Sequence, residues 1–305
     1  MNVFEELRAT RTEPVNIIHG TDWWTDCDDI AALRVLCRAH RAGEINLLCV
    51  GIDSVMEYSA PSVSAFTENE GVCVPIGVDK SAVRDGKNCK YQKLLACYPH
   101  TVSSNCECED AWRLYRRVLA SLPGKADITE VGFPQIIMQL MKSPPDELSP
   151  LTGLKLVKEK VNRIWLMAGK WDETPGREYN LTAYPECCEA GHYICEHSPV
   201  PLVFLGFEVG WGVITGGNQP EGDLLKEAFI AHGSPNGRHS WDPMLVAAAV
   251  TQDLEKAGYT AVYGMARVDE NTGENYFTPG EGNHCYLVKT RPNAFYADRI
   301  NERIR

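Results

Sequence analysis

The sequence has no long hydrophobic run and no excess of basic residues. It contains 305 residues, yet no apolar run reaches the roughly 18 residues of a transmembrane helix, so we expect no membrane partner. Lysine and arginine number 30 against 41 aspartate and glutamate residues, which gives a formal net charge of −11. Because a nucleic-acid backbone is bound by a basic surface, the sequence predicts no nucleic-acid partner.

Two further signals are missing. Residues 1–14, MNVFEELRATRTEP, have no apolar signal core and carry early acids, so we expect a cytoplasmic protein. The 12 cysteines do not form paired CxxC motifs, and the clusters at 105–108 and 186–197 have the wrong spacing for structural zinc. A disulfide scaffold is also unexpected in a chain of this length without a signal peptide.

What the sequence does have is an alternation of short apolar runs and amphipathic stretches. The apolar runs predict buried strands over 15–20, 45–52, 73–78, 128–133, 163–169 and 201–209. The stretches between them predict helices over 28–42, 58–70, 108–121, 134–143, 185–197 and 221–232. This rhythm favours a single α/β domain over 1–305 with a doubly wound, mostly parallel sheet. The segment 80–107 has weak periodicity and is expected to be an insertion or an active-site loop.

Aspartates crowd the junction between the first expected strand and the first expected helix, in IIHGTDWWTDCDDIAALRVL at 17–36. They are Asp22, Asp26, Asp28 and Asp29. The amino end of a helix accommodates one or two acids as caps, but not four, because unpaired carboxylates this close repel one another. A hard divalent cation, Ca²⁺ or Mg²⁺, relieves that repulsion. Doubly wound sheets bind ligands at the carboxyl ends of their strands, so the turn predicts a metal site there.

This turn, Asp-x-x-x-Asp-x-Asp-Asp, resembles a longer variant of the aspartate turn of the inosine–uridine-preferring nucleoside hydrolases. REYNLTAYPECCEA at 177–190 resembles the family's Glu-x-Asn segment followed by a Pro-Glu helix start. HSWDPMLVAAAV at 239–250 resembles its Asp-Pro helix start, and VPLVFLGFEVG at 200–210 resembles the strand between them. The resemblance covers residues 15–290 and implies a nucleoside-hydrolase-like fold.

The resemblance also implies a metal ion and its ligands. Ca²⁺ would be held by Asp22, Asp29 and Asp242, together with a backbone carbonyl that aligns with Gln135. The ion would bind the 2′- and 3′-hydroxyls of ribose and orient a water. The implied reaction is the hydrolysis of the N-glycosidic bond of ribonucleosides to ribose and free base, by a protein that forms dimers or tetramers.

The remaining roles implied by the resemblance belong to the water and the sugar. An aspartate of the turn deprotonates the water, and both Asp26 and Asp28 remain candidates because the turn is two residues longer than usual. Glu178 and Asn180 would bind ribose hydroxyls. Asp53 lies where an asparagine near ribose is common in the family.

One position departs from the family in a way that bears on specificity. Trp241 stands where a histidine precedes the Asp-Pro aspartate, and tryptophan stacks on a base but donates no useful proton. His239, two residues earlier, is the alternative proton donor. Because a purine offers the larger face for stacking, the sequence predicts purine nucleosides as preferred substrates.

Alternatives to a nucleoside hydrolase follow from these departures. The chain could be a weak or inactive relative that binds ribose or nucleosides, or a hydrolase of another N-ribosyl compound. A Mg²⁺ phosphohydrolase is a further alternative, but the sequence has no convincing lysine and hydroxyl loop for a phosphate.

Overall fold

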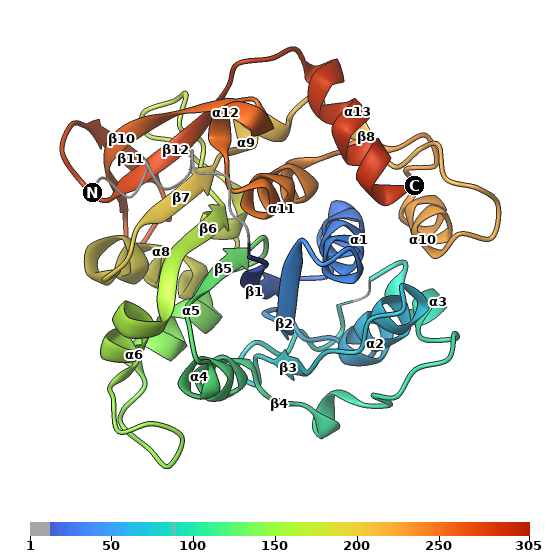
Figure 1. Cartoon of the computed structure of the whole chain (residues 1–305), viewed down its shortest axis with the longest axis horizontal. Helices are drawn as coiled ribbons and strands as arrows, with labels where there is room; N and C mark the ends of the chain where they lie inside the picture. Colours follow the sequence, from blue (N-terminus) through green and yellow to red (C-terminus); the bar gives the residue numbers. More distant parts are fainter. Residues whose placement is uncertain (1–12, 88) are drawn as a thin grey trace.

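A ten-stranded, mostly parallel sheet runs through the computed structural model, which describes residues 13–87 and 89–305 (Figure 1). Residues 1–12, where no signal core is expected, and residue 88 of the 80–107 segment lie outside the described part. In spatial order the strands are β11 (Asn275–Pro279), β10 (Tyr259–Val268), β12 (His284–Lys289), β7 (Leu202–Leu205), β6 (Val161–Met167), β5 (Ala126–Glu130), β1 (Val15–Thr21), β2 (Ile45–Ile52), β3 (Ile76–Val78) and β4 (Glu109–Asp110).

The strand order reverses next to β1. From β1 the chain proceeds outward through β2, β3 and β4, and it then returns to the other side of β1 and continues through β5, β6 and β7. All of these neighbours pair in parallel, and their residues are mostly buried because helices cover both faces of the sheet. The gap outside the carboxyl ends of β1 and β5 is therefore the topological switch point, where such sheets bind ligands.

Two hydrophobic cores occupy the two faces of the sheet. One core contains residues of α1 (Asp28–Arg41), α2 (Ser59–Asn69), α10 (Leu224–His232), α11 (Trp241–Thr251) and α13 (Asn293–Ile304). The other contains residues of α4 (Ala111–Ser121), α5 (Gln135–Lys142), α6 (Gly153–Lys160) and α8 (Pro185–His197). In Figure 1 the two groups of helices lie on opposite sides of the ribbon of strands.

The α/β class and the mostly parallel sheet predicted from the sequence are confirmed. The expected strands and helices up to α10 exist; the bounds of β2 and α8 are as expected, and the others have shifted ends. The expected strand over 201–209 is wrong in its second half. Strand β7 ends at Leu205, and α9 (Phe207–Gly210) follows. The apolar letters there reflect the burial of Val209, 3% exposed, and apolarity alone does not separate a strand from a short buried helix.

The segment 80–107 forms no strand of the sheet within its described residues. It contains α3 (Gln92–Leu95) and a 3₁₀ turn over Asn105–Glu107. The side chain of Gln92 donates to the carbonyl oxygen of Trp23 at 2.8 Å, and the Tyr91 hydroxyl donates to the carbonyl oxygen of Asp26 at 2.9 Å. The segment therefore supports the aspartate turn from outside. No helix within 13–87 and 89–305 is long and apolar enough to cross a membrane.

Candidate active site at the carboxyl edge of the sheet

The aspartate turn connects β1 to α1 and is anchored by Trp23. This residue has a positive φ of 51° and is fully buried, and its indole N–H donates to the Ser62 hydroxyl at 2.9 Å. Its ring packs beside Phe66 and Tyr91. The neighbouring Trp24 instead lines the cavity at the switch point. The turn is thus fixed in the core through one tryptophan while its carboxylates face the cavity.

Three carboxylates gather at the floor of this cavity. Asp28 and Asp29, in the first turn of α1, and Asp242, in the first turn of α11, are 2%, 2% and 5% exposed, and one oxygen from each lies within 4.8 Å of the others. The backbone N–H of Asp242 donates to Asp28 Oδ2 at 3.1 Å, and the Thr21 hydroxyl donates to Asp29. Burial, and then the neighbouring negative charges, raise the pKa of all three carboxyls well above the usual range.

Asp22 lines the same cavity but is held differently. Its Oδ1 accepts hydrogen bonds from the backbone N–H of Trp24 at 2.8 Å and of Thr25 at 3.2 Å. Its Oδ2 accepts from the Thr25 hydroxyl at 2.8 Å. Burial raises the pKa of Asp22 while these hydrogen bonds lower it. Asp22 therefore contributes a well-oriented carboxylate at the edge of the three-carboxylate group.

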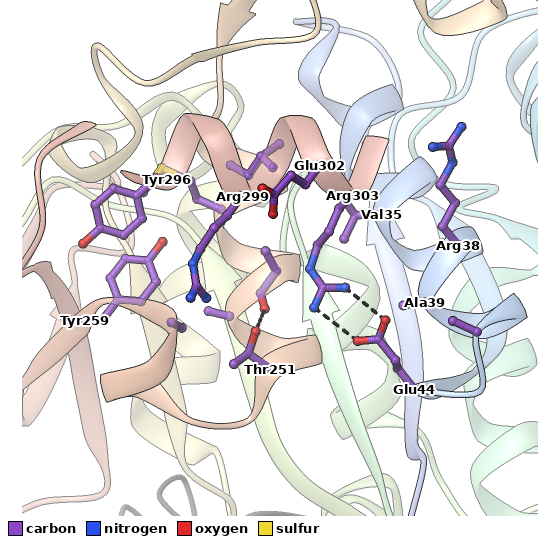
Figure 2. Close-up of a pocket in the computed structure, with 16 residues that line it drawn as sticks. Val35, Arg38, Ala39, Glu44, Thr251, Tyr259, Tyr296, Arg299, Glu302 and Arg303 are labelled. Atoms are coloured by element: carbon purple, nitrogen blue, oxygen red, sulfur yellow. Dashed lines mark hydrogen bonds and ion pairs between the residues drawn. The ribbon is translucent and has the colours of Figure 1, made fainter. Parts of the chain in front are cut away.

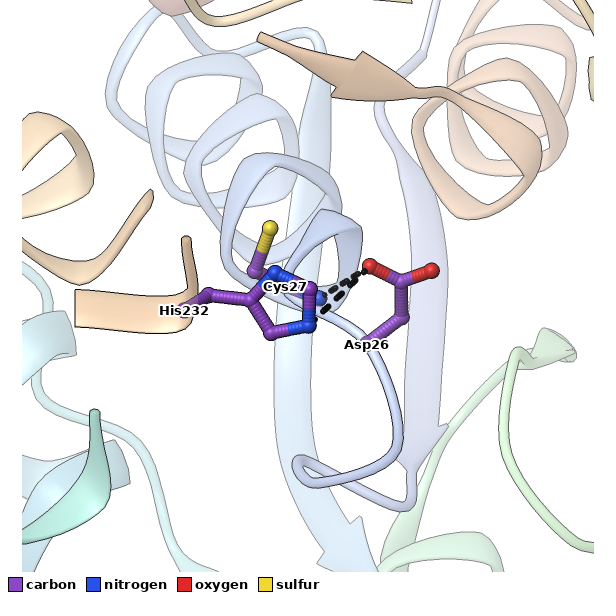
Figure 3. A group of neighbouring side chains, drawn as sticks. All are labelled: Asp26, Cys27 and His232. Carbon is purple, nitrogen blue, oxygen red and sulfur yellow. Dashed lines mark hydrogen bonds and ion pairs between the residues drawn. The ribbon is translucent and has the colours of Figure 1, made fainter. Parts of the chain in front are cut away.

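Asp26 also lines the cavity, but it is paired with a cation. Its Oδ1 and Oδ2 accept from Arg238 Nε at 2.8 Å, and its Oδ2 also accepts from Arg238 Nη2 at 2.6 Å. Figure 3 shows Asp26 beside Cys27 and His232, with the His232 ring nitrogen 3.8 Å from the carboxylate. Cys27 is fully buried, and burial raises the pKa of its thiol. Of the predicted base candidates, only Asp28 adjoins Asp29 and Asp242.

Gln135 and Asp53 lie behind the turn and are not among the residues that line the cavity. The side-chain amide of Gln135 donates to the carbonyl oxygen of Asp53 at 2.6 Å, and both residues are at most 1% exposed. The cavity is lined instead by Val131, directly after β5. A side chain at Gly132 would collide with the Asp53 carboxylate, so this glycine allows the β5 loop to approach the turn.

Glu178, at the end of the loop that follows β6, and Asn180, in the short helix α7 (Tyr179–Thr182), both line the cavity. The Asn180 amide nitrogen donates to the carbonyl oxygens of Val131 and Met167, both at 2.9 Å. Glu178 accepts from the backbone N–H of Asn180 at 2.8 Å and of Gly169 at 3.1 Å. Burial raises the pKa of Glu178 to about 7. These bonds fix both side chains in place before any ligand binds.

Aromatic rings form one wall of the cavity, whose volume is about 690 Å³. Trp241 stacks on Phe207 with ring centroids 5.3 Å apart, and its indole N–H donates to the Phe207 carbonyl at 2.7 Å. His239 does not line this cavity. Its ring stacks on Trp211, and its Nδ1 accepts the backbone N–H of Gly212 at 2.8 Å. The structure thus brings Trp241 to the cavity, whereas His239 lies outside the lining with its ring 5.2 Å from that of Trp241.

Cations at the mouth of the cavity were not predicted from the sequence. Lys170 and Arg177, on the loop that precedes Glu178, and Arg238 all line the cavity. Single basic residues in a loop carry no pattern, and the signals in the sequence are only the positions of Lys170 and Arg177 shortly before Glu178 and of Arg238 directly before His239. Asn275 of β11 holds the loop in place, since its side chain accepts from the Lys170 N–H at 3.0 Å and donates to the Lys170 carbonyl at 2.9 Å.

A second cavity, of about 570 Å³, lies between α1, α11 and α13 (Figure 2). Its charged residues include Arg38, Glu44, Arg299 and Arg303, and the Arg303 guanidinium lies 3.2 Å from the Glu44 carboxylate. None of the site residues predicted from the sequence lines it.

Comparisons with known proteins find the same fold at low sequence identity. No protein-family model matches the sequence, and no curated protein is significantly similar to it. The inosine–uridine preferring nucleoside hydrolase from Bacillus anthracis is similar in structure with a TM-score of 0.67 and 14% identity, over 96% of this chain and 100% of that one.

Two effector proteins are also similar in structure. The type III effector XopQ, solved in complex with adenosine diphosphate ribose, has a TM-score of 0.62 and 14% identity over 99% of this chain and 95% of that one. The effector protein XOO4466 has a TM-score of 0.63 and 13% identity over 99% and 96%. The chain therefore has the nucleoside-hydrolase fold, and the resemblance seen in the sequence is confirmed at that level.

Proposed function

We propose that this protein is a Ca²⁺-dependent hydrolase of the N-glycosidic bond of ribonucleosides, with purine nucleosides preferred. The observation that carries the proposal is the group of three buried carboxylates, Asp28, Asp29 and Asp242, at the switch point of a sheet with this fold. Buried charges of one sign persist only with a compensating partner or with bound protons. The aromatic wall and the fixed polar side chains of the same cavity suit a base and a sugar.

The donor set fits a hard cation. The group offers only carboxylate oxygens, with no thiol or imidazole, which favours Ca²⁺ or Mg²⁺ over zinc. Asp29 and Asp242 are the ligands shared by the geometry and the resemblance. The third is Asp28 by proximity or Asp22 by resemblance. A cation bound there would bind the two ribose hydroxyls and lower the pKa of an adjacent water.

The aspartates of the cavity floor have two roles in the proposed reaction, proton acceptance and charge stabilisation. Whichever of Asp22 and Asp28 is not a metal ligand accepts the proton of the attacking water. Asp26 is a poor base because Arg238 occupies both of its oxygens. The carboxylates around the floor stabilise the positive charge that develops on the ribose ring as the bond breaks.

Positioning of the substrate falls to the opposite side of the cavity. Glu178 and Asn180, fixed by their own hydrogen bonds, orient the ribose hydroxyls. The face of Trp241 stacks on the leaving base, as does Phe207 beside it. Because His239 does not line the cavity and its Nδ1 accepts from Gly212, solvent delivers the proton to the leaving base.

The test combines ribose release with metal analysis. Purified protein is assayed on inosine, adenosine, guanosine and uridine, with Ca²⁺ and with chelator, and activity should appear only with Ca²⁺. Asp22→Asn and Asp28→Asn are compared for bound calcium and for rate. The ligand variant loses metal, whereas the base variant keeps it and loses about 10²–10⁴-fold in turnover. Activity that survives the chelator contradicts the proposal.

A second function is favoured by a specific observation, the structural similarity to XopQ, which was solved with adenosine diphosphate ribose. The chain would then bind, or hydrolyse, an N-ribosyl or ribosyl compound other than a common nucleoside. Stoichiometric binding of adenosine diphosphate ribose, together with no ribose release from any nucleoside, would support this alternative.

A further inference from the structure

The cavity has opposite charges at its two ends. Its floor carries Asp22, Asp28, Asp29 and Asp242, all at most 5% exposed. Its mouth carries Lys170 and Arg177, two residues of one loop, and the same loop places Glu173 beside Lys170. A neutral nucleoside makes use of the floor and the aromatic wall but has no group that needs cations at the mouth.

The loop that carries these cations is held rigidly. Asn275 brackets Lys170 through its side chain, and its backbone N–H and C=O exchange hydrogen bonds with Gly176, both at 2.9 Å. Gly169, next to Lys170, donates its N–H to Glu178. Lys170 and Arg177 therefore start from fixed backbone positions, and such preorganisation reduces the entropy lost when a ligand binds.

The present partners of these cations are easily exchanged. Lys170 Nζ lies 2.6 Å from both Asp172 and Glu173, whose side chains are 52% and 59% exposed. Arg177, 64% exposed, lies 2.9 Å from Glu274. Ion pairs this exposed contribute little to stability. A phosphate dianion, which accepts several charge-assisted hydrogen bonds at once, can take their place.

The position of the loop indicates which part of a substrate the cations would meet. Glu178, the residue proposed to orient the ribose hydroxyls, accepts a hydrogen bond from Gly169, which directly precedes Lys170. The cations of this loop therefore lie near the expected position of the sugar. The base would lie across the cavity, against Trp241 and Phe207, and the diol would face the carboxylates of the floor. With the base and the diol placed in this way, the substituent on the 5′ carbon is the part of the substrate left to face the cations.

We infer that the preferred substrate is a 5′-phosphorylated N-riboside, whose phosphate is bound by Lys170 and Arg177, rather than an unphosphorylated nucleoside. This inference rests on the proposed function. Water adds to C1′, the bond from C1′ to the base breaks, the base leaves with a proton, and the products are ribose 5-phosphate and free base.

The experiment uses the full chain with Ca²⁺ and two matched pairs of probes. Ribose 5-phosphate and ribose have no glycosidic base to lose, so calorimetry measures their binding without turnover. AMP and adenosine report kcat/KM through adenine release. Ribose 5-phosphate should bind at least about tenfold tighter than ribose, the scale of one charge-assisted contact, and AMP should exceed adenosine by a similar factor.

The double variant Lys170→Gln, Arg177→Gln should bring both ratios close to one. Its matched control, Lys142→Gln, Arg303→Gln, removes two cations from ion pairs elsewhere, with Glu189 and Glu44, and should keep both ratios. Raising the salt concentration should lower the ratios of the parent, because exposed charges are screened. Parental ratios of one or less, or ratios that the double variant leaves unchanged, overturn the inference.

The two proposals fail separately. If adenosine is hydrolysed at least as well as AMP and ribose 5-phosphate binds no better than ribose, the inference is wrong and the proposed function stands. If ribose 5-phosphate binds tighter in a Lys170- and Arg177-dependent way but no base is released, the phosphate site stands and the proposed hydrolysis is wrong. No binding and no hydrolysis contradict both.

Discussion

The two cavities of this molecule are of similar size, yet their charges are arranged in opposite ways. In the cavity between α1, α11 and α13, Arg303 faces Glu44 across 3.2 Å, and both side chains reach solvent. At the switch point, the buried carboxylates of Asp28, Asp29 and Asp242 gather within 4.8 Å of one another. Charges that are exposed and already paired need no further compensation. Buried carboxylates this close to one another require either bound protons or a compensating cation.

Removing one floor carboxylate should have the largest effect. We predict that Asp242→Asn abolishes calcium binding and lowers turnover by at least about 10²-fold. In chelator, the same variant should unfold at a higher temperature than the parent, since a repulsive charge is gone from a buried group. Elemental analysis, ribose release and thermal unfolding check the three outcomes. Full calcium occupancy in the variant would refute the ligand assignment.

The pH dependence of stability should come from buried carboxyls in and beside the switch-point cavity, and not from the exposed ion pair of the second cavity. Burial raises the pKa of Glu130 to about 8 and that of Glu178 to about 7, from an ordinary value of 4.5. A raised carboxyl pKa means that the folded state holds a proton the unfolded state has released, so stability is lost as pH rises through the folded pKa. Between pH 6.5 and 8 the free energy of unfolding of the chelated protein should therefore fall.

Denaturant unfolding at several pH values measures this slope. Glu130→Gln should flatten it, because the variant has no carboxyl to ionise at that position. Glu44→Gln, which alters the exposed pair of the second cavity, serves as the control and should leave the slope as it is. Buried His19, whose pKa burial lowers to about 3, stays neutral throughout this range and does not contribute. A flat profile in the parent would contradict the prediction.

A smaller effect is expected at the aromatic wall. If Trp241 stacks on the leaving base, Trp241→Leu should lower the ratio of kcat/KM for inosine over uridine by about two- to twelvefold, the equivalent of roughly 0.5–1.5 kcal/mol. The ratio is the useful quantity because repacking beside Phe207 affects both substrates alike. An unchanged ratio, or a parent that prefers uridine, would show that the ring does not meet the base.

The smallest effect belongs to the second cavity. Arg303→Gln removes an ion pair whose side chains are 28% and 44% exposed, and it should change the free energy of unfolding by only about 0–1 kcal/mol. Calcium content should match that of the parent. A large loss of calcium in this variant would mean that the two cavities are coupled, and the contrast between them would no longer hold.

The sequence revealed the parts of the site that depend on local pattern. The strand before Asp22 and the helix after Asp29 follow from apolar periodicity, so the turn between them could be placed at the sheet edge. The hydrogen-bond partners of Asp26 and Asp28 could not be predicted from local pattern. Arg238 and Asp242 reach them from more than 200 positions away in the chain, through separations of 212 and 214 residues. No periodicity encodes such pairings.

The carboxyl-terminal part of the fold was missed for a related reason. Strands β10, β11 and β12 and helix α13 were not predicted as elements. In β10, an antiparallel strand near the edge of the sheet, only residues 264–268 alternate between buried and exposed, whereas residues 261–263 are all half-buried. The strand therefore has neither the continuous buried run of a central strand nor an alternation along its whole length. Asn275, which fixes the Lys170 loop, lies in this unpredicted region.

The separation of 214 residues between Asp28 and Asp242 has a consequence for biosynthesis. The aspartate turn leaves the ribosome early, whereas α11 follows after most of the chain. At 5–20 residues per second the interval is roughly 10–40 s. During that time the turn holds its acids without the helix that completes the group, so nascent chains are expected to have little affinity for calcium. Under the proposed function, capture of the ion would therefore be a late event that follows the synthesis of α11.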